Sequence, residues 1–192
     1  MKRKLFSYLI LHFFLNLFNN NKYLLPELVY MYEKQGLKTK IYIINLFNFV
    51  DYDMSAFLDG LKGDYRKVYL QNKGKKYVDD PYGKLYEPSQ LDALWGEFRA
   101  TGNYKSVEQV IRALNMTGYT GAMDRFRNSS EKTSEQKADA LKEATYQAAM
   151  WSLGKKNRNK NLVMDYCAYA LQYDNTLSES AKNNLKSILA RN

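Results

Sequence analysis

Cysteine, histidine and proline are scarce in this chain, and each scarcity excludes a class of site or fold. Among 192 residues there are one cysteine, one histidine and three prolines. A single cysteine, Cys167, rules out an intramolecular disulfide and a cysteine-rich zinc site. Because His12 is the only histidine, the HExxH pattern of zinc proteases is absent, and Ser–His or Cys–His catalysis would depend on that one residue. So few prolines, with only ten glycines, exclude a collagen-like or low-complexity protein.

Phosphate-binding and membrane-spanning patterns are missing as well. Neither a P-loop nor a Rossmann glycine pattern occurs in the sequence. The longest mostly apolar run, residues 5–18, is shorter than the roughly 18–20 residues that span a bilayer. The sequence therefore predicts no cofactor and assigns no metal-binding residue.

The chain has an excess of positive charge. The formal net charge is +9, which can indicate contact with nucleic acid or with an anionic membrane. The basic residues are scattered, with short clusters at 2–4, 73–76 and 155–160, and short charge runs usually lie in solvent. The sequence therefore disfavours nucleic acid as a partner, although a basic nucleic-acid-binding helical module stays open as an alternative.

The first fifty residues differ from the rest. Three cations precede the apolar run 5–18, as in a secretory signal, but no small-x-small cleavage site follows. We interpret 1–23 as a signal-like or anchor segment, which makes 5–18 a candidate membrane contact. A buried first helix is the open alternative. This interpretation slightly favours an exported or membrane-associated protein over a cytoplasmic one.

Residues 24–50 form an apolar N-terminal extension. The stretch 24–37 predicts a short helix with Pro26 in its first turn and Gly36 at its end. The stretch 40–53 is ambiguous, because its Ile, Tyr, Phe and Val residues favour a strand but no hairpin partner is evident.

From residue 51 onward, apolar residues recur at helical spacing and predict one helical domain, 51–192. Asp51 or Asp53 suits the N-cap of its first helix. Gly60 and Gly63 indicate either close helix contact or a break near residue 63. Five apolar residues share one face of that helix: Met54, Phe57, Leu58, Leu61 and Val68. The segment 72–89 contains glycines and prolines and predicts an irregular stretch packed onto the body. Residues 115–133, rich in Gly, Ser, Thr and Asn, are the main candidate for a mobile segment.

The most organised stretch is 91–114, in which Thr-Gly-Asn separates two amphipathic helices. Trp95 and Phe98 lie on the apolar face of the first helix, and Gly102 suits a left-handed C-cap. Ser106 begins the capping signature of the second helix. Two helices joined so closely must fold antiparallel and bury their apolar faces together.

Three more helices are predicted after residue 133. The first opens with Thr133 as part of a capping signature, and its predicted buried line is Ala138, Leu141, Ala144 or Thr145, Ala148 and Trp151. The second holds Cys167 on its apolar face as a small buried hydrophobe. The last faces inward with Ala181, Leu185, Ile188 and Leu189.

A weak internal repeat connects two of these hairpins. When 150–171 is aligned with 94–114, Trp151 falls on Trp95, the polar turns correspond, and both segments end in Ala-Leu after one inserted residue. This pattern indicates two related helical hairpins, a common way to build a helical array.

The hairpin 91–114 also resembles a tetratricopeptide unit, on the basis of Leu94, Phe98, Gly102, Ile111 and Leu114. It departs from that motif at Trp95, where a small residue is expected, and the motif's period of about 34 residues does not recur. The LWxxFxATG segment at 94–102 resembles segments of uncharacterised bacterial all-helical proteins, over roughly 51–171. Both resemblances imply a helical fold, and neither implies an activity.

Two kinds of candidate site residue remain. Asp79, Asp80, Asp92 and Glu97 are the acids that catalysis could use, although turn formation and capping explain them more simply. Tyrosine is abundant, with 17 residues, and its amphipathic ring suits protein and carbohydrate surfaces. The predicted interaction surface consists of seven tyrosines around the irregular middle of the chain: Tyr65, Tyr69, Tyr77, Tyr82, Tyr86, Tyr104 and Tyr119.

The sequence as a whole predicts an all-α protein. Its helical hairpins are antiparallel and form a small array, either tetratricopeptide-like or an irregular bundle. The favoured function is a non-enzymatic protein-interaction module with an unidentified protein partner. An envelope-associated enzyme that uses carboxylates is the chief rival. No catalytic, cofactor-binding or metal-binding residue is assigned.

Overall fold

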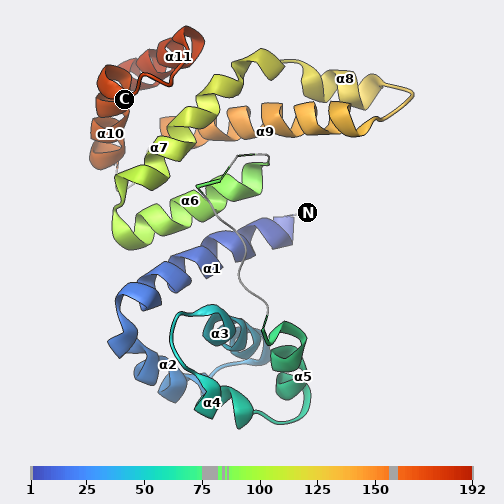
Figure 1. Cartoon of the computed structure of the whole chain (residues 1–192), viewed down its shortest axis with the longest axis vertical. Helices are drawn as coiled ribbons and strands as arrows, with labels where there is room; N and C mark the ends of the chain where they lie inside the picture. Colours follow the sequence, from blue (N-terminus) through green and yellow to red (C-terminus); the bar gives the residue numbers. More distant parts are fainter. Residues whose placement is uncertain (1, 75–81, 84, 86, 156–159, 192) are drawn as a thin grey trace.

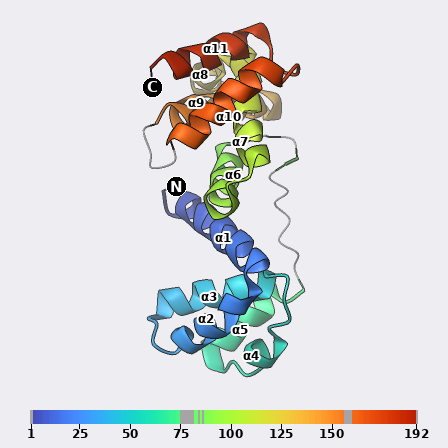
Figure 2. The ribbon, with the colours of Figure 1, turned by 90° about the vertical axis from the view of Figure 1, so that its left-hand side faces the viewer.

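The computed structural model describes residues 2–74, 82–83, 85, 87–155 and 160–191, with the side chains of 2–9 and 160 left aside. Within these residues every regular element is a helix, which confirms the all-α prediction. The helices form two lobes, one above the other in Figure 1 and Figure 2. We call α1–α5 the N-terminal lobe and α6–α11 the C-terminal lobe.

The N-terminal lobe shows that the ambiguous stretch 40–53 is mainly helical. Pro26 lies in the first turn of α2, where its missing N–H is not needed, as predicted. The predicted helix after residue 51 is divided in two, with a break between Asp59 and Gly63. The elements of this lobe are α1 (Lys2–Asn20), η1 (Lys22–Leu24), α2 (Leu25–Tyr32), α3 (Leu37–Phe49), α4 (Ser55–Asp59) and α5 (Gly63–Asn72).

One hydrophobic core joins all five α-helices of this lobe. Leu15 of α1, Phe47 of α3 and Tyr69 of α5 are all buried in it. From the sequence we expect the segments 1–23, 24–50 and 51–192. In the structure, the boundary between the two hydrophobic cores lies at the connection between α5 and α6. The reason is that 51–72 completes the apolar surface of the preceding helices and contributes nothing to the second core.

The predicted signal-like run 5–18 lies within α1. Its C-terminal part packs into the fold, because Leu15 and Phe18 are each only 6% exposed. In the part of the chain that the structure describes, no helix combines the length and apolar character needed to cross a bilayer.

The C-terminal lobe contains the hairpin predicted at 91–114. Gly102 ends α6 in the left-handed conformation (φ 69°), as predicted, and its N–H donates to the carbonyl of Phe98. Asn103, and not Ser106, caps the next helix, because that helix begins earlier than predicted. The elements are α6 (Pro88–Thr101), α7 (Tyr104–Arg112), η2 (Ala113–Tyr119), α8 (Ala122–Asn128), α9 (Ser134–Gly154), α10 (Lys160–Tyr173) and α11 (Glu179–Ala190).

A second core fills this lobe, and Trp95, Phe98, Cys167 and Ile188 lie in it as predicted. The predicted buried line of α9 is wrong at its ends. Ala138 is exposed, and Trp151 is 65% exposed, whereas the buried side chains include Ala140, Ala149 and Leu153. Alanines occur on more than one face of this helix, so their spacing does not single out the buried one. The alignment of Trp151 with Trp95 therefore does not extend to their packing.

The segment 115–133, predicted to be mobile, contains most of η2 and all of α8. These elements pack against α9. The irregular stretch before α6 packs onto the second core through Tyr82 and Leu85, as predicted.

The two lobes meet where α1 lies along α6 (Figure 1, Figure 2). Ala93 and Gly96 of α6 are buried, yet Ala93 belongs to neither core. On a helix of 3.6 residues per turn these two positions point away from Leu91, Leu94 and Phe98. We therefore infer that α1 covers them, and that their small side chains allow the two helices to approach closely.

Candidate functional site

The predicted interaction tyrosines are distributed over both lobes. Tyr69 is buried in the first core, and Tyr65 packs against that core. In the C-terminal lobe, Tyr104 contacts two tyrosines of α10, and the Tyr119 hydroxyl accepts a hydrogen bond from Lys142. Tyr82 packs on the second core, and Tyr77 and Tyr86 lie outside the described residues. The structure thus does not bring the described members together into one surface.

The candidate acids do not form a catalytic pair in the described part of the chain. Glu97 is 8% exposed and accepts a hydrogen bond from the Tyr82 hydroxyl at 2.5 Å. Burial raises the pKa of Asp92, and the charge of Arg99 opposes that shift. Five positions apart on α6, the two acids point about 140° away from each other. Asp79 and Asp80 lie outside the described residues.

The Glu97 carboxylate has a structural use. The Tyr82 hydroxyl lies 3.3 Å from the hydroxyl oxygen of Ser106, which is fully buried on α7. These contacts hold Tyr82, which lies in the segment before α6, against both helices of the α6–α7 hairpin. Ser106, predicted as a cap, serves here as a buried polar contact.

Other reactive side chains are held in the core. Cys167 is fully buried, and burial raises the pKa of its thiol to about 12, which keeps it protonated and unreactive. His12 is 4% exposed on α1. Among the described residues, no three His, Cys, Asp or Glu side chains gather so that they could hold a metal ion.

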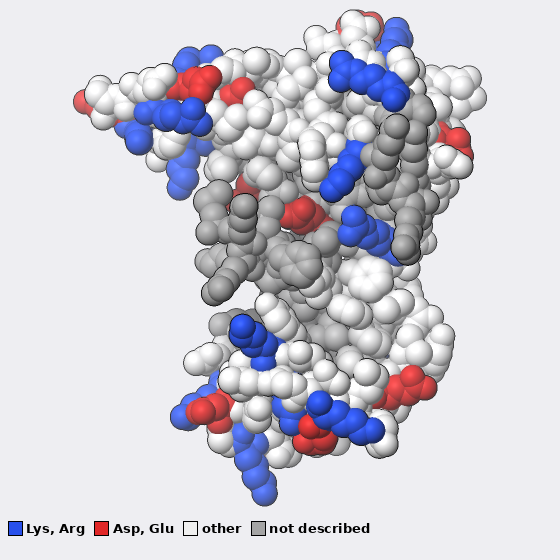
Figure 3. Space-filling view, turned by 180° about the vertical axis from the view of Figure 1, so that it is seen from behind, with Lys and Arg blue, Asp and Glu red and all other residues white. Residues whose placement is uncertain are grey.

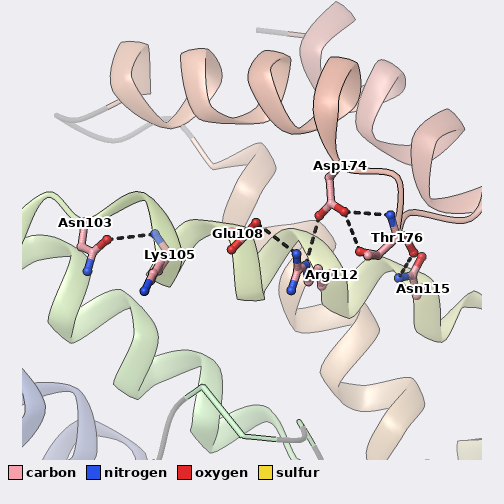
Figure 4. A network of polar contacts seen from close by, with 7 residues as sticks. All are labelled: Asn103, Lys105, Glu108, Arg112, Asn115, Asp174 and Thr176. Atoms are coloured by element: carbon pink, nitrogen blue, oxygen red, sulfur yellow. Dashed lines mark hydrogen bonds and ion pairs between the residues drawn. The ribbon is translucent and has the colours of Figure 1, made fainter.

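A polar network fixes the turn between α10 and α11 to α7 (Figure 4). Arg112 donates from Nε to Asp174 and from an Nη atom to Glu108, each at 3.1 Å. Asp174 also accepts hydrogen bonds from the backbone N–H and the hydroxyl of Thr176. Burial opposes the ionisation of Asp174, but these hydrogen bonds outweigh it and lower its pKa. Since its carboxylate is engaged by donors within the fold, the network stabilises the lobe and does not form a ligand site.

An apolar groove in the N-terminal lobe is the strongest candidate site. It lies between α1, α2 and α3 and has a cavity volume of about 480 Å³. Among its described lining residues, Gln35, Thr39 and Tyr42 carry polar groups, and none is charged. The lining residues are Ile10, Leu11, Phe14, Phe18, Leu28, Met31, Gln35, Thr39, Tyr42, Ile43 and Leu46.

Helical spacing builds the walls of this groove. In α1, Ile10, Phe14 and Phe18 follow one another at intervals of four residues, and Thr39, Ile43 and Leu46 do much the same in α3. The floor is closed, because Phe18, Ile43 and Leu46 are buried. The rim is open: Phe14 is 38%, Met31 50% and Tyr42 54% exposed.

The sequence contained a signal for this groove that our interpretation did not use. Apolar residues in 5–18 cover more of the helix than one buried face needs, since Leu15 and Phe18 enter the core while Phe14 stays at the rim. We attributed that excess to export or anchoring. The next segment, 24–50, also has surplus apolar residues, but the sequence alone does not show that the two surplus faces meet.

Comparison with known proteins does not place the chain in a family. No family model matches it, and comparisons with curated proteins and with solved structures find no match. The resemblances at 91–114 and 94–102 stay predictions.

Proposed function

We propose that this protein is a non-enzymatic protein-interaction module that binds an amphipathic helix of a partner protein in the groove between α1, α2 and α3. The observation that supports this function is the groove itself, in which large apolar side chains stay open to solvent around a closed floor. Concave apolar surfaces of this size are the usual form of binding sites in folded proteins.

The chemistry of the groove favours a helix over an extended peptide. A helix satisfies its backbone hydrogen bonds internally, whereas an extended chain needs partners for its N–H and C=O groups. The described groove offers few polar groups, on Gln35, Thr39 and Tyr42, so it suits a ligand whose backbone groups are already hydrogen-bonded.

The dimensions agree with such a ligand. Ile10 to Phe18 of α1 covers roughly 12 Å at 1.5 Å per residue, and these residues form one wall of the groove. A helix of about two to three turns would match this length and present apolar residues at i, i+3 or i+4, and i+7. Because the described lining residues are all uncharged, the docking face of the partner is expected to be uncharged as well.

Photo-crosslinking in the native cells tests this function. We would replace Tyr42, at the groove rim, by p-benzoylphenylalanine. A second variant with the same replacement at Tyr23 is the control, because Tyr23 is 74% exposed but does not line the groove. We expect a discrete adduct with another protein from position 42 that position 23 does not give. Equal adducts from both positions, or an adduct only with a second copy of this chain, would contradict the proposal.

The crosslinked segment of the partner then allows a quantitative test. It should be helical with one apolar face, and a synthetic peptide of it should bind the full-length protein. Met31→Asp should weaken that binding at least about tenfold, because burying a methionine contributes about 1.5–3 kcal/mol. Leu70→Asp is the matched control, since Leu70 is 52% and Met31 50% exposed but only Met31 lines the groove. Equal effects of the two variants would contradict binding in the groove.

A further inference from the structure

A second hollow lies in the other lobe, between α8 and α9. Its cavity volume is about 410 Å³, and its lining differs in chemistry from that of the groove. Five apolar side chains and three cations surround it: Met123, Phe126, Ala140, Leu141, Ala144, Arg127, Lys132 and Lys137. We call these eight residues the α8–α9 slot.

The slot is held in shape by a buried carboxylate. Glu143 of α9 is 4% exposed and accepts hydrogen bonds from the backbone N–H groups of Gly121 and Met123, at 2.8 and 2.6 Å. These donors stand at the start of α8, so the bonds fix that helix against α9. Gly121 is left-handed there (φ 83°), a conformation that favours glycine. The slot is therefore formed before any ligand arrives.

Two of the three cations are available to a ligand. Arg127 pairs with Asp124 at 3.3 Å, and both side chains are 75% exposed. Lys132 lies over the ring of Phe126, 5.6 Å from its centroid. In the described residues, which include the whole of 87–155, no carboxylate forms an ion pair with Lys132 or Lys137.

We propose that the α8–α9 slot is a second binding site, for an acidic peptide segment that carries one aromatic or aliphatic side chain among its carboxylates. The apolar side chain would enter the hollow beside Phe126 and Leu141. The flanking carboxylates would reach Lys132 and Lys137, where charge-assisted hydrogen bonds form. The two sites together make the protein a two-site adaptor, with an uncharged groove in one lobe and a cationic slot in the other.

A peptide fits this slot better than a membrane surface does. A bilayer can take up apolar side chains only where they project from the protein. Within residues 113–150, all of which are described, no large apolar side chain is exposed. Met123 and Phe126 are partly buried. The projecting end of α8 and α9 mixes acidic with basic side chains (Figure 3), so a broad anionic surface would also meet its carboxylates, whereas a short peptide needs to contact only the slot.

Fluorescence anisotropy with the full-length protein tests the site. The probe is a short fluorescein-labelled peptide of glutamate and alanine with one central phenylalanine. We expect Lys132→Glu/Lys137→Glu to weaken binding at least about tenfold, and added salt to weaken it as well. The matched control is Lys186→Glu/Arg191→Glu, which makes the same charge change on an exposed residue of α11 and on its exposed C-cap residue. It should bind like the wild type.

A second variant and two further probes complete the test. Glu143→Gln keeps all three slot cations but loosens α8, so it should weaken binding if the preformed shape matters. The peptide with alanine in place of phenylalanine should bind several-fold more weakly. Equal binding of both peptides, equal loss in the control variant, or preferential binding of phosphatidylserine vesicles through Lys132 and Lys137 would overturn the proposal.

Discussion

The two lobes bury apolar residues in a similar way but differ in how their helices are held. In the C-terminal lobe, α6, α7, α9 and α11 begin with side-chain caps or capping boxes. In the N-terminal lobe, α2, α3 and α5 begin without a side-chain cap hydrogen bond. Such caps contribute about 1 kcal/mol each, so these four C-terminal helices have a source of stability that the three N-terminal helices lack.

The polar contacts between helices also differ between the lobes, with buried carboxylates in the C-terminal lobe and neutral amides between α3 and α5. Buried carboxylates connect helices of the C-terminal lobe, through Asp174 to α7 and through Glu143 to α8. The described contacts between α3 and α5 are instead made by neutral amides, such as Asn72 with Asn45. Hydrogen bonds to a buried charge stabilise more strongly than neutral ones.

The N-terminal lobe also leaves more apolar surface open. Phe14, Met31, Leu37, Tyr42 and Leu70 are among its exposed large side chains, and three of these five stand around the groove. The C-terminal lobe therefore has more side-chain caps and buried carboxylate contacts, while the N-terminal lobe has an open apolar groove and fewer such stabilising contacts. This difference agrees with the proposed function, because binding elements are drawn from the less stable parts of a fold.

The two tryptophans give the largest expected contrast. Trp95→Ala should lower the free energy of unfolding by about 3–5 kcal/mol, because Trp95 is buried in the second core. Trp151→Ala should cost only about 0.5 kcal/mol, since this side chain is mostly exposed and loses little beyond its contact with Lys155. Urea unfolding of both variants measures the difference. Similar costs would contradict the assignment of Trp95 to the core and Trp151 to the surface.

The network at the α10–α11 turn should matter next. Asp174→Ala should destabilise the protein by about 2–3 kcal/mol, because it removes a buried carboxylate and leaves Thr176 without its acceptor. Asp165→Ala, on the exposed side of α10, is the control and should be nearly neutral. Thermal unfolding monitored by circular dichroism would measure the stability of both variants. A neutral Asp174 variant would remove one of the differences between the lobes.

Glu143 should give the C-terminal lobe a dependence on pH. Its pKa is lowered, chiefly by the hydrogen bond from the Met123 N–H. A lowered pKa stabilises the fold above the unfolded value of about 4.3, and this contribution is lost as pH falls below it. Glu143→Gln should cost about 1–2 kcal/mol at neutral pH, since one buried N–H loses its acceptor. The gap between variant and wild type should narrow on acidification; a gap independent of pH would contradict this role.

The smallest effect on stability is expected at the groove. Met31→Asp should change the free energy of unfolding by within about 0.5 kcal/mol, because Met31 is half exposed and substitutions at such surface sites are usually near neutral. Phe47→Ala, in the core of the same lobe, should cost about 3–5 kcal/mol. A large cost for Met31→Asp in urea unfolding would show that the groove rim supports the fold and is not free for a partner.

Local sequence patterns predicted much of the C-terminal lobe. Gly102, the Thr133–Gln136 capping box and the inward residues of α11 all follow from rules that act within a few residues. The buried face of α9 could not be predicted, because alanine is equally compatible with several faces and the neighbours decide. The clamp between Glu143 and Met123 joins residues 20 positions apart and has no local signature.

The groove could not be predicted for a different reason. Its residues come from α1, α2 and α3, and each helix alone is only an apolar segment with a surplus face. The sequence showed the surplus in 5–18 and 24–50 but not that the surplus faces meet. The abundance of tyrosine indicated an interaction surface, yet Tyr69 is buried in a core that helices from several segments form together.

Hydrogen exchange of the free, full-length protein tests the central claim most directly. Exchange read by mass spectrometry would compare peptides from α3 with peptides from α7, because each of these helices contributes four buried residues to its lobe. We predict that α3 exchanges at least about tenfold faster, because its lobe has weaker caps and an unfilled groove. Equal or slower exchange in α3 would contradict the lower stability that we assign to the N-terminal lobe.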